Sequence, residues 1–340
     1  MGGGRSDDIR RRALIRRIRD LRLRFRGHAM FPPLLICDRK TAERRFRDAL
    51  ARARASYLEI RDSFPLPKGF VHPAWEENIR EVESYFLDHF DMTFLNHPRI
   101  NGTMVFTDRS AHSAEWSFLK TWRPADTLRQ CLAGGMNAPF LAGRQRTATL
   151  INSAHHLYHI AQFETFRRET VEGIGTVVEF GGGYGNLARI FRNLGHAGGY
   201  VIIDLPLFCC IQYVYLATLF GSDAVRILSG PGEGVFDDAI RLVPISILER
   251  IRLEGDLFIS TWALSESPSA AYDLTLRRNW YGAREILLGF HEAWKPWDMD
   301  ELVGSLKTRF GRVAVEPIPF LPGSYYLFAT GQPGAEGLGG

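Results

Sequence analysis

Cysteine is scarce in this sequence, and its spacing builds neither a metal site nor a disulfide framework. Four cysteines occur among the 340 residues, and no pair of them forms the Cys-x-x-Cys unit of structural zinc sites. Cys209 and Cys210 are neighbours, and we expect them on one helix. This usage favours a reducing compartment, so we expect a cytoplasmic protein.

Long apolar runs are also missing. The most apolar window, Phe208–Phe220, is shorter than the ~20 residues that a membrane-spanning helix needs, and we expect a buried helix instead. The N-terminus has no apolar segment of the secretory kind. Hydrophobic residues nevertheless make up 45% of the chain, which is ample for the core of a globular protein larger than one typical domain.

Charge is nearly balanced outside one segment. The formal net charge is +4, and arginine is concentrated between Arg5 and Arg26. Apolar residues recur there at helical spacing: Leu14, Ile18, Leu21 and Phe25. Residues 1–30 are therefore predicted to form a basic amphipathic arm that packs on the body or on a partner, such as a second copy in a homodimer. Attachment to an anionic surface and a role in targeting are the alternatives. Because the body is nearly neutral, nucleic acid is not the expected partner.

What the sequence does contain is a glycine-rich loop between two strand-like segments. An apolar run from Val177 includes Glu179, and glycines follow at positions 181, 182, 183 and 185. Asn186–Leu194 then has helical apolar spacing, and Gly199–Asp204 predicts a second strand that ends in a carboxylate. Strand, glycine loop, helix and strand together form a βαβ nucleotide-binding unit, in which Asp204 is placed to accept hydrogen bonds from ribose hydroxyls.

The spacing of these glycines separates two classes of ligand. A dinucleotide fingerprint requires Gly-x-Gly-x-x-Gly, and its third glycine would fall on Asn186. The carboxylate of Glu179 would also repel a pyrophosphate, whereas it suits a ligand with an ammonium group. S-adenosylmethionine has that group and a ribose for Asp204. A nicotinamide-dependent oxidoreductase is therefore disfavoured.

Two sets of residues resemble a known family. The segment Glu179–Gly185 with Asp204-Leu-Pro206 resembles the cofactor site of class I S-adenosylmethionine-dependent methyltransferases. The segments Phe258–Ser267 and Asn152–His156 resemble bacterial sugar O-methyltransferases. The resemblance implies S-adenosyl-L-methionine as cofactor and a saccharide-like small molecule as acceptor, methylated on a hydroxyl. The residues expected to bind the cofactor are Glu179, Gly181, Gly182, Gly183, Gly185, Asp204, Leu205, Ser260 and Thr261.

The predicted fold is α/β, with a Rossmann-like, mainly parallel sheet. Further strands are expected at Ala224–Leu228, Asp256–Ser260 and Glu285–Phe290, and a closing hairpin at Val313–Pro317 and Tyr325–Thr330. Residues 31–170 are predicted to be mainly helical and residues 171–331 to form the cofactor-binding domain. The resemblance implies that the helical region covers the cofactor and shapes the substrate pocket; a dimerisation region is the alternative. Residues 332–340 are predicted to be disordered.

Ligands in such sheets bind at the carboxyl ends of strands, so residues just after the strands are catalytic candidates. Methyl transfer to a hydroxyl needs a positioned base, and histidine is the commonest one. We predict His291 as the base, with Glu266 orienting it or the hydroxyl; a solvated loop histidine and a helix-start glutamate are the alternative interpretations. His156 is a second candidate, because His155 and His156 are expected to point in different directions, with only one facing the pocket.

Aromatic residues near the expected pocket suit a sugar, whose C–H faces pack on aromatic rings. Trp262 and Trp294 are predicted to contact the substrate, and a place in the core is the alternative. His155 and His159 have a spacing that a metal could use, but no acid or cysteine lies nearby in the sequence, so no metal site is predicted. The acidic run from Asp298 is better explained as a helix start with a capping pair.

Two other functions remain open from the sequence. One is methylation of a different small-molecule oxygen, nitrogen or carbon centre in a biosynthetic pathway. The other is a methyltransferase-like, non-catalytic partner protein. Glu179, the glycine loop and Asp204 argue against a loss of cofactor binding, and they give no information about the base.

Overall fold

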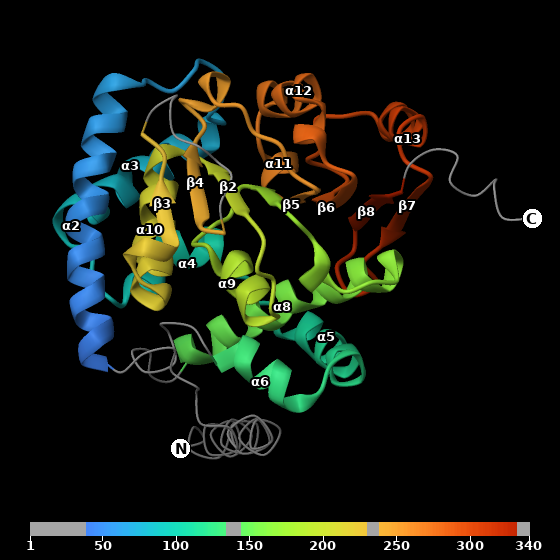
Figure 1. Ribbon diagram of the computed structural model, residues 1–340, viewed down its shortest axis with the longest axis horizontal. Coiled ribbons are helices and arrows are strands. Elements are labelled where there is room, and N and C mark those ends of the chain that lie inside the picture. Colours follow the sequence, from blue (N-terminus) through green and yellow to red (C-terminus); the bar gives the residue numbers. More distant parts are fainter. Residues whose placement is uncertain (1–38, 134–143, 230–237, 332–340) are drawn as a thin grey trace, which may run out of the picture.

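The computed structural model describes residues 39–133, 144–229 and 238–331. The predicted basic arm and the predicted tail lie outside these ranges. A sheet of eight strands forms the centre, with helices on both sides (Figure 1). The strands are β1 (Val177–Phe180), β2 (Tyr200–Asp204), β3 (Val225–Ile227), β4 (Ile240–Pro244), β5 (Leu257–Thr261), β6 (Glu285–His291), β7 (Arg312–Pro317) and β8 (Ser324–Thr330). The α-helices are α2 (Arg39–Ser63), α3 (Pro73–Asp88), α4 (Pro98–Met104), α5 (Arg109–Trp122), α6 (Ala125–Ala133), α8 (Arg144–Arg167), α9 (Asn186–Asn193), α10 (Pro206–Phe220), α11 (Ala263–Glu266), α12 (Ser269–Arg277) and α13 (Met299–Lys307).

The strand order confirms the predicted fold. Across the sheet the order is β3-β4-β2-β1-β5-β6-β8-β7. Neighbouring strands from β3 to β6 are parallel, whereas β8 runs antiparallel to both β6 and β7. The chain therefore forms a Rossmann-like sheet closed by an antiparallel C-terminal hairpin. The strand order reverses between β1 and β5, which is where ligands bind in sheets of this kind.

Strand β4 was not predicted from the sequence. Its five residues include Arg241 and end in Pro244, and charge and proline both weaken a strand pattern. In the structure β4 pairs with β2, from Tyr200↔Ile240 to Asp204↔Pro244. The predicted third strand is present as β3, but it lies outside β4 as the edge strand of the sheet.

Alternate residues of the central strands face two separate hydrophobic cores, because side chains of a strand point to opposite faces. In β2, Tyr200 and Ile202 pack with the helices α8, α9 and α10, whereas Val201 and Ile203 pack with α11, α12 and α13. Figure 1 shows α12 and α13 above the sheet and α8 and α9 below it. Helix α10 is buried over nearly its whole length, as predicted. Among the described residues, no helix combines the length and the apolar character needed to cross a membrane.

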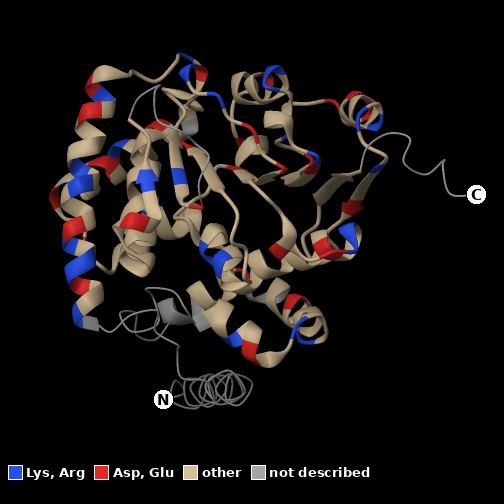
Figure 2. Ribbon diagram, viewed as in Figure 1, with Lys and Arg blue, Asp and Glu red and all other residues tan. Residues whose placement is uncertain are grey.

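The region before β1 is helical, as predicted. Helix α2 packs along α10 and stands at the outer edge of the molecule (Figure 1). Figure 2 shows basic and acidic residues interspersed along α2, which is typical of a solvated helix face. The stretches 105–122 and 123–141, whose structure the sequence left open, contain α5 and α6.

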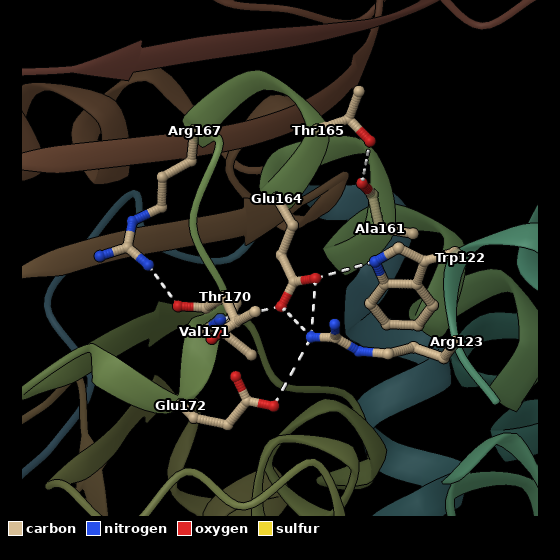
Figure 3. Close-up of polar contacts among 9 residues, drawn as sticks. All are labelled: Trp122, Arg123, Ala161, Glu164, Thr165, Arg167, Thr170, Val171 and Glu172. Atoms are coloured by element: carbon tan, nitrogen blue, oxygen red, sulfur yellow. Dashed lines mark hydrogen bonds and ion pairs between the residues drawn. The ribbon is translucent and has the colours of Figure 1, made fainter. Parts of the chain in front are cut away.

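A single buried carboxylate, that of Glu164 in α8, joins this helical region to the first strand (Figure 3). Its oxygens accept hydrogen bonds from Trp122 Nε1 at 2.8 Å, from Arg123 Nη2 at 2.9 Å and from the backbone N–H of Val171 at 2.8 Å. Trp122 and Arg123 lie at the end of α5, and Val171 opens the turn that leads into β1. Burial raises the pKa of Glu164, and the Val171 N–H and the Arg123 guanidinium oppose that rise.

We predict that Glu164→Gln lowers the free energy of unfolding by about 2–3 kcal/mol, because the amide removes the charge that Arg123 pairs with and leaves a buried hydrogen bond unmade. Glu169→Gln is the matched control. The Glu169 carboxylate pairs with Arg167 at 3.2 Å, but its side chain is 73% exposed, so the change should be below ~0.5 kcal/mol. Urea unfolding of both variants measures the difference, and equal losses would contradict this role of Glu164.

Candidate functional site

A cavity of about 580 Å³ lies where the carboxyl ends of β1, β2, β5 and β6 meet the helical region. Its volume is in the range of sites for small molecules and cofactors. The sheet contributes the loop after β1 and the residues that follow the other three strands. The opposite wall comes from helix α8, from the segment between α4 and α5, and from the turn before α3.

The loop after β1 passes so close to its neighbours that only glycine fits at one of its positions. Gly181 has φ +76°, and a Cβ placed there would lie 2.0 Å from the Cβ of Ala263. Gly185 has φ +91° and directly precedes α9, with Leu216 behind it. These φ values favour glycine. The predicted glycine loop is therefore present, and Gly181, Gly182 and Gly183 line the cavity, whereas Gly185 does not.

Glu179 is buried beside this loop. Its side chain lines the cavity and accepts a hydrogen bond from the Tyr200 hydroxyl at 2.8 Å. Burial raises the pKa of Glu179 from 4.5 to about 8, although the Tyr200 hydrogen bond acts in the opposite direction. The carboxylate of Asp204 raises it further. In the absence of a ligand, this group is thus costly to ionise.

Asp204 ends β2, as predicted, and is bonded to the glycine loop. Its carboxylate accepts hydrogen bonds from the backbone N–H of Leu205 at 2.8 Å and from Gln212 Nε2 at 2.7 Å. Gln212 Nε2 also donates to the carbonyl of Gly183 at 3.0 Å. Burial raises the pKa of Asp204 to about 7. Gln212 was not predicted from the sequence, although a single amide within the most apolar window of the chain was a signal for it.

Helix α8 places three histidines on the wall opposite the glycine loop: His155, His156 and His159. The prediction that only one of His155 and His156 would face the pocket was wrong. Successive residues of a helix are only about 100° apart, and the cavity is wide enough to meet both. His156 Nδ1 lies 3.1 Å from the amide nitrogen of Asn186, at the end of the loop, whereas His155 Nδ1 contacts Glu115.

His155 is bonded to a carboxylate that the sequence did not identify. Its Nδ1 contacts the Glu115 carboxylate, and both side chains are buried. The ring of Phe106 stacks on His155 at a centroid distance of 3.7 Å. Glu115 was missed because it lies 40 residues earlier, within a stretch whose structure was left open. Its position between Ala111 and Leu119, at helical spacing, was the available signal.

His159 is bonded to the second strand of the C-terminal hairpin. The hydroxyl of Tyr326 lies 2.6 Å from His159 Nδ1, and no described residue is bonded to the buried Nε2 of that ring. Burial keeps the pKa of His159 well below its ordinary value, and it lowers that of His156 to about 3. Both rings are therefore neutral near pH 7.

Thr261, which ends β5, and Trp262, which follows it, line the cavity as predicted. Trp262 has φ +65°, which is rare for a bulky residue and marks a strained position. Its ring packs closely over Gly289, where a Cβ would lie 3.2 Å from it. The rings of His155 and His159 lie 5.4 Å and 5.3 Å from the Trp262 ring.

The remaining predicted residues divide into two groups. Glu266, His291, Trp294 and Leu205 line the cavity. Burial raises the pKa of Glu266, and His291 stacks on Trp294 at 4.5 Å while its Nδ1 accepts from the Ala293 N–H. Ser260 does not line the cavity. Its hydroxyl donates to the Phe180 carbonyl at 3.0 Å and accepts from Leu264 N, so it connects β1, β5 and α11.

Within residues 39–133, 144–229 and 238–331, no three His, Cys, Asp or Glu side chains are grouped so that they could hold a metal ion. The acidic run after Trp297 starts helix α13, and Asp298 Oδ1 accepts from the Glu301 N–H at 3.0 Å. This capping contact confirms its predicted role.

No family model matches the chain, and no curated protein matches it. Similar solved structures include the pyocyanin biosynthetic protein PhzM, at 16% identity over 72% of this chain and 75% of that chain, with a TM-score of 0.35. The mitomycin 7-O-methyltransferase MmcR is 13% identical over 85% of this chain and 98% of that chain, with a TM-score of 0.36. Magnesium protoporphyrin IX methyltransferase from Synechocystis PCC 6803, solved with bound SAH, is 13% identical over 64% of this chain and 100% of that chain, with a TM-score of 0.37. Because these sequence identities and TM-scores are low, the fold is assigned from the strand order of this chain.

The raised pKa of Glu179 predicts how stability depends on pH. The unfolded chain ionises this carboxyl near 4.5 and the folded chain near 8, so the folded state is favoured less as pH rises between these values. Glu179→Gln removes this dependence and keeps an acceptor for Tyr200. Relative to the wild type, the variant should gain on the order of 2–4 kcal/mol of unfolding free energy between pH 5 and 8. Urea unfolding at both pH values measures the gain, and an unchanged difference would contradict the burial of an ionisable Glu179.

Proposed function

We propose that this protein is an S-adenosylmethionine-dependent O-methyltransferase that acts on a hydroxyl of a sugar or a glycosylated small molecule. The observation that carries the proposal is the glycine loop after β1, set between the buried carboxylate of Glu179 and the half-buried carboxylate of Asp204. Both carboxylates line one cavity at the reversal of strand order, where the fold binds its ligands. We further propose a cytoplasmic location, following the cysteine usage of the chain.

The residues present fit S-adenosylmethionine. The backbone at Gly183, where a Cβ would lie 3.8 Å from its nearest neighbour Met104, admits a flat ligand close to the loop. Asp204 stands at the end of β2, where a carboxylate can accept hydrogen bonds from two ribose hydroxyls. Gln212 Nε2 holds the Asp204 carboxylate in place with a hydrogen bond of 2.7 Å. Leu205 and Thr261 complete the wall.

The charges of the site favour a cation. Burial makes Glu179 and Asp204 costly to ionise in the empty protein. A bound ammonium or sulfonium group would lower the pKa of both carboxyl groups and so offset the cost of ionising them. A pyrophosphate would raise both pKa values and add to that cost. This reasoning favours S-adenosylmethionine over a nicotinamide dinucleotide, in agreement with Asn186 at the position of the third glycine.

Methyl transfer supplies the electrophile from the cofactor, so the chain must position the acceptor hydroxyl and take its proton. The candidates for the base are His291, Glu266 and His156, all on the cavity wall. Trp262 and Trp294 offer aromatic faces to a sugar ring. Trp294 is 55% exposed and stacks on His291 near the surface, so it suits the outer end of an acceptor.

Other acceptors remain within the proposed activity. A different oxygen, nitrogen or carbon centre on a small molecule could contact the same cavity wall. Methylation assays with a panel of acceptors would identify it. A non-catalytic partner protein would bind the cofactor and lack turnover with every acceptor. The pairing of two copies and the role of residues 31–170 as a lid stay predictions.

We predict that the purified chain binds S-adenosylmethionine and its demethylated product with micromolar affinity and does not bind NADH. Calorimetric titration with the three ligands in parallel tests this. Asp204→Ala should weaken binding of both methyl-donor species by roughly tenfold to over a hundredfold, about 1.5–3 kcal/mol, because the ribose loses a charged acceptor. Asp223→Ala, an exposed acid of the turn before β3, should leave the affinity unchanged. Binding of NADH alone would overturn the proposed function.

A further inference from the structure

We propose that His155, held by Glu115, is the base for the acceptor hydroxyl, and that His159 binds a second oxygen next to it. The acceptor class that follows is a molecule with two adjacent oxygens, such as the vicinal hydroxyls of a sugar ring. This inference rests on the proposed function, because it requires a methyl donor in the same cavity. It assigns the chemistry to helix α8 rather than to the end of β6.

The two histidines form one wall of the cavity. They lie four residues apart on α8, so their side chains share one face of the helix, and their ring centroids are 4.1 Å apart. In each ring it is Nδ1 that is bonded within the protein, to Glu115 in one case and to Tyr326 in the other. Nε2 is the nitrogen left for a ligand on both rings.

One buried nitrogen at this wall has no hydrogen-bond partner among the described residues, which points to a ligand. His159 Nε2 is buried and has no partner among the described residues, in a side chain that is 1% exposed and lines the cavity. Buried polar atoms are nearly always hydrogen-bonded, so a bound hydroxyl is the natural partner. The ring of His159 is neutral, and a neutral imidazole nitrogen suits a hydroxyl, which can both donate and accept.

Glu115 provides His155 with a carboxylate that can orient its ring and stabilise its charged form. Of the four histidines His155, His156, His159 and His291, His155 alone is bonded to a carboxylate of the part of the chain that the structure describes. A carboxylate on the far nitrogen fixes the tautomer of the ring and stabilises the imidazolium that forms when the ring takes a proton. By comparison, His291 uses its Nδ1 in a local turn with Ala293.

The surroundings of His155 favour proton transfer. Phe106 covers one face of the ring at 3.7 Å, and Trp262 lies 5.4 Å away. These rings exclude water, which strengthens the interaction between the imidazolium and Glu115. S-adenosylmethionine supplies the methyl group, and the electron pair of its carbon–sulfur bond stays on sulfur. The acceptor oxygen forms the new bond to carbon as its proton moves to His155 Nε2, and that proton leaves to solvent with the product.

The test is a methylation assay with the full chain, S-adenosylmethionine and a panel of methyl glycosides of glucose, mannose, galactose and rhamnose. Each member has vicinal hydroxyls. We expect at least one to be methylated at a hydroxyl with a neighbouring hydroxyl, and its analogue deoxygenated at that neighbour to lose at least about tenfold in kcat/KM. If the chain binds the methyl donor but methylates no panel member, this inference fails while the proposed cofactor stands. Activity that appears only with added Mg²⁺ or Zn²⁺ would also overturn it.

Variants separate the roles of the wall residues. His155→Ala should lower kcat by about 10²–10⁴, with binding of the demethylated cofactor retained. Glu115→Gln should lower kcat by about tenfold or more with KM unchanged, since Glu115 acts through His155. His159→Phe should raise KM for the diol to that of its deoxy analogue. His89→Gln, at an exposed site after α3, is the control and should match the wild type. A loss confined to His291→Ala, with His155→Ala fully active, would overturn the assignment.

Glu115 is buried, so its variant must be shown to fold. Thermal unfolding of Glu115→Gln and His155→Ala, with and without the demethylated cofactor, provides that check. If both variants unfold above the assay temperature and still bind the demethylated cofactor, a lower kcat reports on catalysis and not on loss of the fold. If Glu115→Gln is unstable, Glu115→Asp replaces it. A Glu115→Asp variant that keeps more than half of the wild-type kcat supports the pairing, and full activity of a stable Glu115→Gln contradicts it.

Discussion

The seating of helix α8 against the sheet is the constraint on which the rest of the site depends. Glu164 fixes one end of the helix through three hydrogen bonds. Arg189 of α9 fixes the middle: its fully buried guanidinium donates to Ser153 Oγ at 3.1 Å, to the Cys131 carbonyl at 2.7 Å and to Asn186 Oδ1 at 2.8 Å. A buried charge is tolerated only when its donors are satisfied, so Arg189 fixes the spacing between α6, α8 and α9. Asn152 adds a bond to the Tyr184 hydroxyl at 2.9 Å. Through these contacts the histidines of α8 face the glycine loop.

The same cavity stores unfavourable electrostatics that a ligand can relieve. Glu179 and Asp204 both lie at the cavity wall. Burial raises the pKa of each, and the Asp204 carboxylate raises that of Glu179 further. On the opposite wall the histidines His156 and His159 are held neutral by burial. The cavity therefore has an acidic side, suited to a cationic donor, and a neutral imidazole side, suited to hydroxyls. A site that is destabilising when empty contributes binding energy when filled, which is a common relation between stability and function.

The sequence predicted those parts of the structure that follow from local patterns. The glycine loop, the acid at the end of β2 and the buried helix α10 each depend on a contiguous run, and each was confirmed in place. Strand β4 was missed because its position beside β2 is decided by tertiary pairing rather than by its own five residues. Glu115, Gln212 and Tyr326 were missed for a related reason: each is recognised only by its contact, with partners 40, 8 and 167 residues away. A single carboxylate or tyrosine in an apolar helix or strand carries little information until the fold shows what it touches.

The general rule that catalytic residues follow the strands agrees with the proposed cofactor side of the cavity, and the proposed acceptor side departs from it. It led to His291, which does line the cavity, but whose free ring nitrogen is not oriented by a carboxylate. The rule concerns the sheet, and here the wall facing the sheet belongs to helices that precede it in the chain. Because α8 is bonded to the turn before β1 by Glu164 and to α9 by Arg189, it can position a base as a strand end does. The two walls also come from separate parts of the sequence, so the acceptor wall can vary while the loop between Glu179 and Asp204 keeps its geometry. A fold of this kind can thus retain one cofactor and change acceptors through its helical region alone.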